Sequence, residues 1–241
     1  MKYSKRILAK DGREIELRSA AAADGGAVLD CFQQTHGETD FLLTYPEESR
    51  FDPEQEGRFL ARKEESANEI ELIALADGRV VGTAGVDAVG ARYKVAHRAE
   101  FGISVRKAYW GLGIGRSLME ACIQCARDAG YVQLELSVIA ENTRAIAMYQ
   151  KAGFVECGRN PKGFRSRTAG YQELVSMRLE LPSGGRKVHR LLHRDAGRRD
   201  LPVLRFVHEG QLAGGDPRSG QDPAGHHRHL PLQPQPGVSG L

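Results

Sequence analysis

The sequence lacks any apolar run near the roughly 20 residues that a membrane-spanning helix needs, so no such helix is expected. Its first 20 residues carry charged side chains throughout and have no apolar core of the kind found in secretory signal peptides. Apolar residues make up 41% of the chain and charged residues 27%, which is typical of a globular protein. We therefore expect a cytoplasmic protein that does not bind membranes.

Cysteine is scarce, with four residues in the chain. Cys122 and Cys125 form a CxxC pair, a spacing found in redox and metal sites. The pair lies inside a helical pattern, and no second CxxC or CxxH pair accompanies it. This favours two small side chains packed on a helix, and we expect no metal.

Positive charge is concentrated after residue 181. From Pro182 onward there are nine Lys/Arg and five Asp/Glu, whereas residues 1–181 carry 25 and 26 respectively. A near-neutral body does not favour nucleic-acid binding. A nucleic-acid-associated protein that uses the basic tail remains an alternative, and it predicts strongly salt-dependent binding.

The composition also changes at this point. Residues 182–241 hold seven of the ten prolines and six of the eight histidines. Such a segment buries too little apolar surface to offset an ordering cost of about 1–2 kcal/mol per residue. We expect one domain over residues 1–181 and a disordered, low-complexity basic tail over residues 182–241. A frame-shifted end and a metal- or nucleic-acid-binding arm are the alternatives for the tail.

The hydrophobic periods of residues 1–181 predict an α/β fold with a mixed, mainly antiparallel central sheet and about four flanking helices. Strand patterns cover residues 13–20, 70–76, 80–89, 96–105, 132–139, 154–159 and 171–181. Helical patterns cover residues 22–37, 52–63, 115–129 and 143–153. Asp24, Asp52 and Asn142 are expected N-caps, and Gly130 and Gly153 are expected to end the last two helices.

Three glycines on alternate positions, Gly111, Gly113 and Gly115, precede the helix 115–129. Between a strand and a helix they expose successive backbone N–H groups, which together with the helix dipole form an anion cradle. A Cβ at these positions would hold a phosphate off or forbid the required dihedral angle. The alternative is a turn needed only for tight packing. A Walker loop is excluded because Arg116 and Ser117 follow the last glycine, and the spacing is not G-x-G-x-x-G.

Two blocks carry a family resemblance. "YWGLGIGRSLME" resembles the pyrophosphate loop Q/R-x-x-G-x-G/A of the GCN5-related N-acetyltransferase (GNAT) family, with Trp110 at the first position. Because this loop binds phosphate through its backbone, Trp110 is expected to alter affinity rather than ligand identity. The second block, residues 134–154, is similar to the family pattern N-x-x-A-x-x-x-Y-x-x-x-G-F, and it matches at Asn142, Ala145, Tyr149, Gly153 and Phe154. The resemblance covers about residues 13–181.

The resemblance implies a GNAT-like fold that holds acetyl-CoA in a V-shaped split between the strand ending at Val105 and the strand 134–139. The first strand would pair with the pantetheine arm and the glycine loop would hold the pyrophosphate. Asn142 would contact the cofactor, act as a plain helix N-cap, or both. The implied cofactor-binding residues are Ile103, Ser104, Val105, Trp110, Gly111, Leu112, Gly113, Ile114, Gly115, Arg116 and Asn142.

The implied chemistry is attack of a neutral amine on the thioester with release of CoA thiolate. Tyr149 matches the family's general acid, and Glu100 resembles the strand glutamate that serves as base in the histone-modifying branch. In the ribosomal-protein branch the base lies on the later strand, where Ser137 is the counterpart and Glu135 shares its face. The alternatives are an exposed strand glutamate for Glu100 and Glu135, and a core tyrosine for Tyr149.

The acceptor is expected to contact the loops 35–49 and 160–173. The acidic residues of the first loop suit a cationic amine, or they form an ordinary solvated face; they are Glu38, Asp40, Glu47 and Glu48. The leading hypothesis is an acetyl-CoA-dependent N-acetyltransferase acting on a primary amine of a small molecule or peptide, in a family where homodimers are common. The alternative is a non-catalytic CoA-binding regulatory module with the same fold.

Overall fold

A computed structural model of the protein describes residues 1–182, which form an eight-stranded sheet in the order β1-β2-β3-β4-β5-β6-β8-β7. The pair β5 and β6 is parallel and the other neighbouring pairs are antiparallel, so the expected mixed, mainly antiparallel α/β fold is confirmed. The strands are β1 (Ser4–Leu8), β2 (Glu14–Ser19), β3 (Ile70–Ala76), β4 (Arg79–Ala88), β5 (Arg98–Val105), β6 (Gln133–Ile139), β7 (Val155–Ser166) and β8 (Gly170–Glu180).

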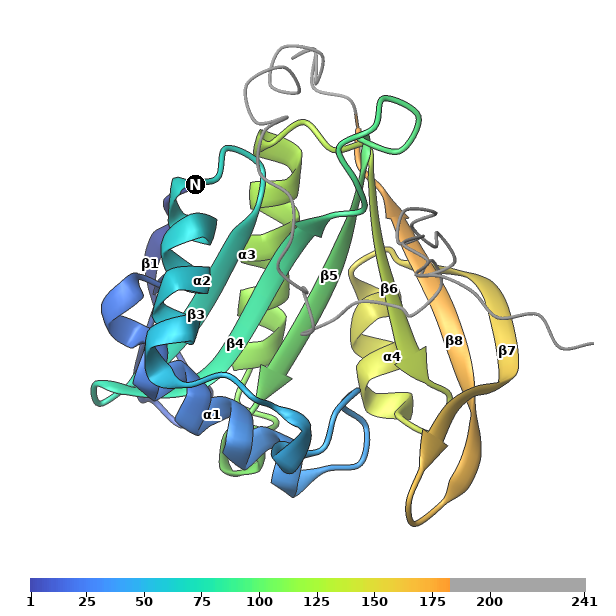
Figure 1. Cartoon of the computed structure of the whole chain (residues 1–241), viewed down its shortest axis with the longest axis horizontal. Helices are drawn as coiled ribbons and strands as arrows, with labels where there is room; N and C mark the ends of the chain where they lie inside the picture. The colour runs from blue at the N-terminus through green and yellow to red at the C-terminus, as the bar shows by residue number, and fades with distance from the viewer. Residues whose placement is uncertain (183–241) are drawn as a thin grey trace, which may run out of the picture. The chain divides into compact units, whose positions relative to one another are not determined.

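Four α-helices cover the two faces of the sheet (Figure 1). Side chains of α1 and α2 pack with Ile73 on one face, and α3 packs with Leu72 and Phe101 on the other face. Tyr149 places α4 in the same core cluster as α3. The helices are α1 (Gly25–Glu38), α2 (Pro53–Glu65), α3 (Ile114–Asp128) and α4 (Thr143–Lys151), with short 3-10 turns at Ala22–Asp24, Pro46–Glu48 and Lys107–Tyr109.

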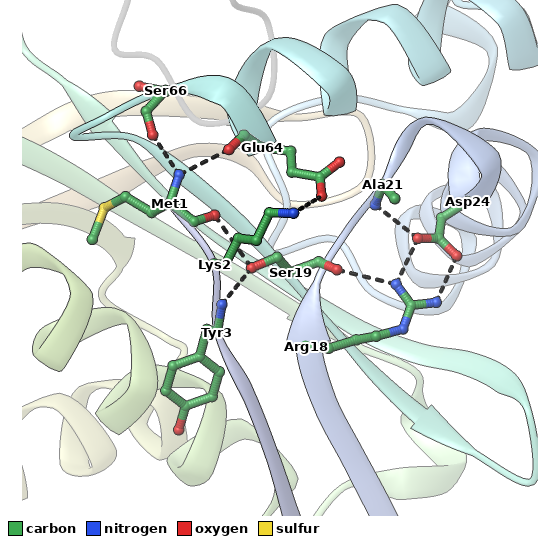
Figure 2. Close-up of polar contacts among 9 residues, drawn as sticks. All are labelled: Met1, Lys2, Tyr3, Arg18, Ser19, Ala21, Asp24, Glu64 and Ser66. Carbon is green, nitrogen blue, oxygen red and sulfur yellow. Dashed lines mark hydrogen bonds and ion pairs between the residues drawn. The ribbon is translucent and has the colours of Figure 1, made fainter.

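The helix caps follow the sequence at α2 but not at α1. The Asp52 side chain accepts a hydrogen bond from Gln55 N at 2.8 Å, and Gln55 Oε1 accepts one from Asp52 N at 3.0 Å, which is a full capping box. Asp24, in contrast, does not cap α1 with its side chain. Its carboxylate instead accepts hydrogen bonds from Arg18 at 2.7 and 2.8 Å and from Ala21 N at 2.8 Å (Figure 2).

The N-terminal strand β1 was not expected from the sequence, because its residues are mostly exposed and two of the five are charged. Its pairing with β2 is supported by backbone contacts at its start (Figure 2). Tyr3 N donates to Ser19 Oγ at 2.8 Å, and the Met1 ammonium donates to Glu64 O, at the end of α2, at 3.0 Å. These contacts tie the edge of the sheet to α2.

The segment 160–173 is not the loop that the sequence indicated. Strand β7 continues through Pro161 and Gly163 to Ser166, with register shifts where it passes these residues, and residues 167–169 alone form the turn to β8. The expectations for the tail concern residues 183–241, which lie outside the described part of the chain. No helix among residues 1–182 is long and apolar enough to cross a membrane.

Candidate active site

The sheet separates between β5 and β6. The two strands pair at only three positions, the last being Glu100 with Glu135, although β5 continues to Val105 and β6 to Ile139. Figure 1 shows the strands diverging toward their C-terminal ends. We call the region between these unpaired halves the split. It leaves the backbone of the second half of β5 without a neighbouring strand on one side.

The backbone groups that face the split can be assigned from the ladder on the other side of β5. Arg106 N donates to Val81 O at 2.9 Å, so the even-numbered residues of β5 direct their N–H and C=O groups toward β4. The odd-numbered residues Ile103 and Val105 therefore direct theirs toward the split. Ser104 is paired with β4 through its backbone, and its hydroxyl lies 3.3 Å from Thr83 Oγ1.

The glycine loop follows β5 and leads directly into α3. Gly111 and Gly113 have φ angles of +83° and +93°, a conformation that side chains with a Cβ rarely adopt. Gly113 is the N-cap of α3, and its carbonyl accepts the first helical hydrogen bond, from Ser117 N at 3.0 Å. Gly115 differs, because it is helical and a Cβ there would make ordinary contacts of 3.7–3.8 Å. The conformational requirement thus applies to the first two glycines.

Trp110 fastens this loop to the end of β5. Its indole Nε1 donates to Val105 O at 2.6 Å, and the Arg144 guanidinium of α4 lies 5.4 Å from the centroid of its ring. Leu112 O accepts a hydrogen bond from Lys10 N of the β1–β2 turn at 3.0 Å. Trp110, which stands where the family pattern has Gln or Arg, therefore has a structural role. Its hydrogen bond uses the carbonyl of Val105, which is one of the groups that face the split.

Tyr149 lies on α4, and its ring packs against β5 on the face of the sheet that α3 covers. It is buried, its ring is edge-on to Phe101 at a centroid distance of 6.2 Å, and Phe154 lies 5.8 Å away. Burial raises the pKa of the phenol well above its usual value. Tyr149 is therefore neutral at physiological pH and keeps its proton as a hydrogen-bond donor.

Three carboxylates lie side by side across β4, β5 and β6. Asp87 is opposite Glu100, and Glu100 is opposite Glu135, so their side chains share one face of the sheet. Lys63 of α2, which is 4% exposed, forms an ion pair with Asp87 and donates to Val86 O at 3.2 Å. This contact places the row of carboxylates on the face covered by α1 and α2.

Glu100, the middle carboxylate of the row, differs electrostatically from its neighbours. Arg98 donates two hydrogen bonds to Glu135, one of them at 2.6 Å from Nη2. Burial alone would raise the pKa of Glu135, but the hydrogen bonds from Arg98 and Gln133 outweigh it and lower the pKa. Burial raises the pKa of Glu100, and the charges of Glu135 and Asp87 raise it further. Within residues 1–182, the carboxylate of Glu100 has no hydrogen bond or ion pair.

The remaining sequence candidates have structural partners. Asn142 is the N-cap of α4, and its Oδ1 accepts a hydrogen bond from Ala145 N at 3.3 Å. Cys122 and Cys125 pack in the core on α3. Burial raises the pKa of the Cys122 thiol well above its usual range and that of Cys125 to about 11. Both cysteines therefore behave as core side chains, and the packing interpretation of the CxxC pair holds.

The segment that holds the glycine loop, Glu100 and Tyr149 matches the model of a known family. The family model described as "Acetyltransferase (GNAT) family" matches residues 35–154, from the last turn of α1 to just beyond α4. The chain belongs to the GNAT family. An acetyltransferase of this family from Streptococcus pneumoniae has a solved structure that is 27% identical, with a TM-score of 0.67. The match covers 69% of this chain and 99% of that chain.

Two curated relatives that are named as N-acetyltransferases match shorter segments. L-amino acid N-acetyltransferase AaaT of Escherichia coli is 36% identical over 85 residues, which are 35% of this chain and 52% of the relative. N-alpha-acetyltransferase RimI of Mycobacterium tuberculosis is 35% identical over 92 residues, which are 38% of this chain and 56% of the relative. The chain thus spans about half the length of these curated relatives.

In this GNAT chain the acidic loop after α1 is held to the tip of the β7–β8 hairpin. Asp40 accepts hydrogen bonds from Tyr45 Oη at 3.0 Å, from Thr168 Oγ1 at 2.8 Å and from Ser166 Oγ. Tyr45 Oη in turn accepts from Arg167 N at 2.8 Å. We call this contact the Asp40 junction. It brings together the two segments that the sequence indicated for the acceptor.

The carboxylates of the acidic loop are all engaged within the protein. Glu38 accepts hydrogen bonds from Gln34 Nε2 and Lys107 N, Glu47 pairs with Arg167, and Glu48 accepts one from Tyr45 N. Among the described residues, Glu47 alone pairs with a positive side chain and the other donors are neutral, so the loop keeps most of its negative charge and its attraction for a cationic amine stays a prediction. These charges hold the loop in place.

Sequence reasoning did not identify Lys63, Arg98 or Arg106. Lys63 and Asp87 are 24 residues apart and Arg98 and Glu135 are 37 apart, so no local pattern links them. Arg106 is 3% exposed and lies against Gln34 of α1. The one signal in the sequence was the position of Arg106, which continues the alternating pattern of side chains in β5.

Proposed function

We propose that the protein is an acetyl-CoA-dependent N-acetyltransferase that moves an acetyl group to a primary amine of a small molecule or peptide. The observation that carries this proposal is the left-handed pair Gly111 and Gly113 at the start of α3, next to the split. The first N–H groups of a helix have no partner within it, and they favour an anion such as a pyrophosphate. Membership of the GNAT family supports the same ligand.

The loop from Trp110 to Arg116 would hold the pyrophosphate through its backbone. The pantetheine arm would lie along β5, where Ile103 offers both of its backbone groups to the split. Val105 would offer its N–H alone, since its carbonyl accepts from Trp110. The side-chain amide nitrogen of Asn142 would remain available to the cofactor, because its Oδ1 serves as the cap of α4.

In the proposed reaction the amine nitrogen attacks the thioester carbonyl, a C–N bond forms and the C–S bond breaks. Glu100 would take the proton of the amine, directly or through water, because it is the carboxylate of the row that has no positive partner. Its raised pKa brings it closer to neutral pH, where general bases are most effective. Tyr149 would donate its proton to the departing thiolate from the opposite face.

The first test is titration of acetyl-CoA into the full chain by calorimetry, beside two variants. Gly113→Ala introduces a Cβ at a left-handed position of the loop. Gly78→Ala introduces one at a similar φ of +74° in the β3–β4 turn, which is outside β5, β6 and the glycine loop. Saturable binding by the wild type and Gly78→Ala, with loss in Gly113→Ala, is the expected result. A folded wild type that does not bind would overturn the proposal.

Turnover separates an enzyme from a CoA-binding module. An amine panel is assayed with acetyl-CoA by detection of the released thiol. Release that depends on the amine and on Tyr149 supports the enzyme, whereas binding without release for any amine supports the regulatory module.

A further inference from the structure

Arg106 is a buried guanidinium that lacks a negative partner. It is 3% exposed, and its Nη1 donates to the neutral side-chain amide of Gln34. Its Nε has no hydrogen-bond partner, and no carboxylate of residues 1–182 forms an ion pair with it. A buried charge without compensation is costly, so a guanidinium in this state is suited to an anionic ligand.

The position of Arg106 relates it to Glu100. Arg106 directly follows β5, and its N–H continues the ladder with β4, so Glu100, Ser104 and Arg106 alternate onto the same face. This face is the one covered by α1, whose Gln34 contacts Arg106. The glycine loop leads instead into α3 on the other face. Arg106 therefore lies on the side of the proposed amine rather than on the side of the pyrophosphate.

A second unpaired polar atom lies on this face. Gln172 of β8 is 8% exposed, and its Oε1 has no partner among the described residues. Ser176 is opposite Ser137 in the register of β6 and β8, and Gln172 shares the face of Ser176 because it is four residues away. Donor and acceptor atoms without partners thus occur on both sides of the split, on the face of Glu100.

The orientation of the guanidinium is fixed by α1. Gln34 Nε2 donates to Glu38 Oε1 at 2.8 Å, which directs its Oε1 toward Arg106. Glu38 Oε2 accepts from Lys107 N at 2.6 Å, so the amide and the end of β5 are held together. A planar guanidinium held in this way matches the two oxygens of a carboxylate.

We propose that the acetyl acceptor is an amine that also carries a carboxylate, and that Arg106 binds this carboxylate while the amine faces Glu100. This inference rests on the proposed function and narrows its substrate class to amino acids and related amino carboxylates. Arg106 is six residues from Glu100, about 20 Å along a strand. Both side chains are long, and the amine proton can reach Glu100 through water, as in the proposed reaction.

The test compares amines that differ only in the carboxylate. L-Phenylalanine with 2-phenylethylamine, L-leucine with isopentylamine and L-methionine with 3-(methylthio)propylamine are assayed as acceptors of the full chain, by thiol release. We expect kcat/KM to be at least tenfold higher for the carboxylated member of a pair that is used. Equal use of both members would overturn this inference alone. No turnover of any amine would overturn the proposed function, and this inference with it.

Variants assign the preference to Arg106. In Arg106→Gln the KM of the carboxylated amine should rise until the preference is lost, while the decarboxylated amine and acetyl-CoA keep their KM values. Arg106→Lys should retain part of the preference, and it serves as the second variant if the first does not fold. Arg159→Gln removes a guanidinium from the exposed β7–β8 hairpin and should leave the preference intact. An equal loss for both amines, or a raised KM for acetyl-CoA, would overturn the assignment.

Discussion

Tyr149 and Glu100 lie on opposite faces of the sheet, on either side of β5. The Tyr149 ring packs edge-on against Phe101, and Phe101 adjoins Glu100 in a strand whose side chains alternate between the faces. The proposed base and the proposed acid therefore do not contact each other, and β5 separates them. An amine that enters from the side of α1 and a thiolate that leaves toward α4 would each meet one proton-transfer group.

Replacement of Glu100 tests the proposed base. Glu100→Gln keeps the size of the side chain and removes the acceptor for the amine proton, so kcat should fall about 10²- to 10⁴-fold. In the wild type, activity should decrease as the pH falls through the raised pKa of Glu100, because the protonated carboxyl cannot act as a base. The pH profile of kcat/KM for both proteins checks this. A variant that keeps the acidic limb would assign that limb to another group.

Replacement of Tyr149 tests the proposed acid. Tyr149→Phe removes the hydroxyl and preserves the contacts with Phe101 and Phe154, so thermal stability should change little. We expect kcat to fall about 100-fold, while the affinity for acetyl-CoA stays the same. Steady-state kinetics and calorimetry of the same preparation measure both quantities. Unchanged kcat would reduce Tyr149 to a core side chain.

The ion pair of Lys63 and Asp87 should influence the proposed base from a distance. In Lys63→Met the buried Asp87 loses its partner, which should cost about 3–5 kcal/mol of unfolding free energy. The uncompensated charge beside Glu100 should raise the pKa of Glu100 and move the acidic limb of the pH profile to higher pH. The double variant Lys63→Met/Asp87→Asn should reverse both effects. An acidic limb that does not move would show that the pKa of Glu100 does not depend on the ion pair of Lys63 and Asp87.

Replacement of Glu135, on the other side of Glu100, should shift the pKa of Glu100 in the opposite direction. Glu135→Gln removes a negative neighbour of Glu100 and releases the positive charge of Arg98. Both changes lower the pKa of Glu100, so the acidic limb should move to lower pH. Measured beside Lys63→Met in the same buffers, the two variants should shift the limb in opposite directions. Shifts of the same sign would contradict the proposed electrostatics.

Disruption of the Asp40 junction should weaken binding of the acceptor amine and leave the affinity for acetyl-CoA unchanged. Asp40→Asn loses acceptor capacity for the hydroxyls of Tyr45, Ser166 and Thr168, at about 1 kcal/mol for one hydrogen bond. The KM of the amine should therefore rise about fivefold, and amide hydrogen exchange should quicken in residues 39–49 and 166–169. Glu156→Gln on the outer side of the same hairpin is the control. A changed acetyl-CoA affinity would argue against a role confined to the acceptor.

Local features of the chain were predictable from the sequence, and long-range pairings were not. The glycine loop, the α3 period and the Asp52 cap depend on neighbouring residues, and each lies where the sequence places it. Asp24 is a cap by residue type, yet its carboxylate pairs with Arg18, six residues earlier, and does not cap α1. The second half of β7 looked like a loop because of Pro161 and Gly163, which an edge strand accommodates through register shifts.

The candidate site divides in the same way. The loop and Tyr149 stand in motifs, so their places could be predicted from one sequence. The charges around Glu100 come from α2, β4 and β6, and they meet only when the sheet has formed. The same is true of Arg106, whose lack of a negative partner depends on what α1 brings against it.

The distribution of thiols also has a practical consequence. Cys31, Cys122 and Cys125 are buried, whereas Cys157 is exposed on β7, at the edge of the sheet. A maleimide dye added to the folded protein should thus react at one position, with no cysteine removed beforehand. The sequence therefore carries one attachment point for a fluorophore, on the β7–β8 hairpin.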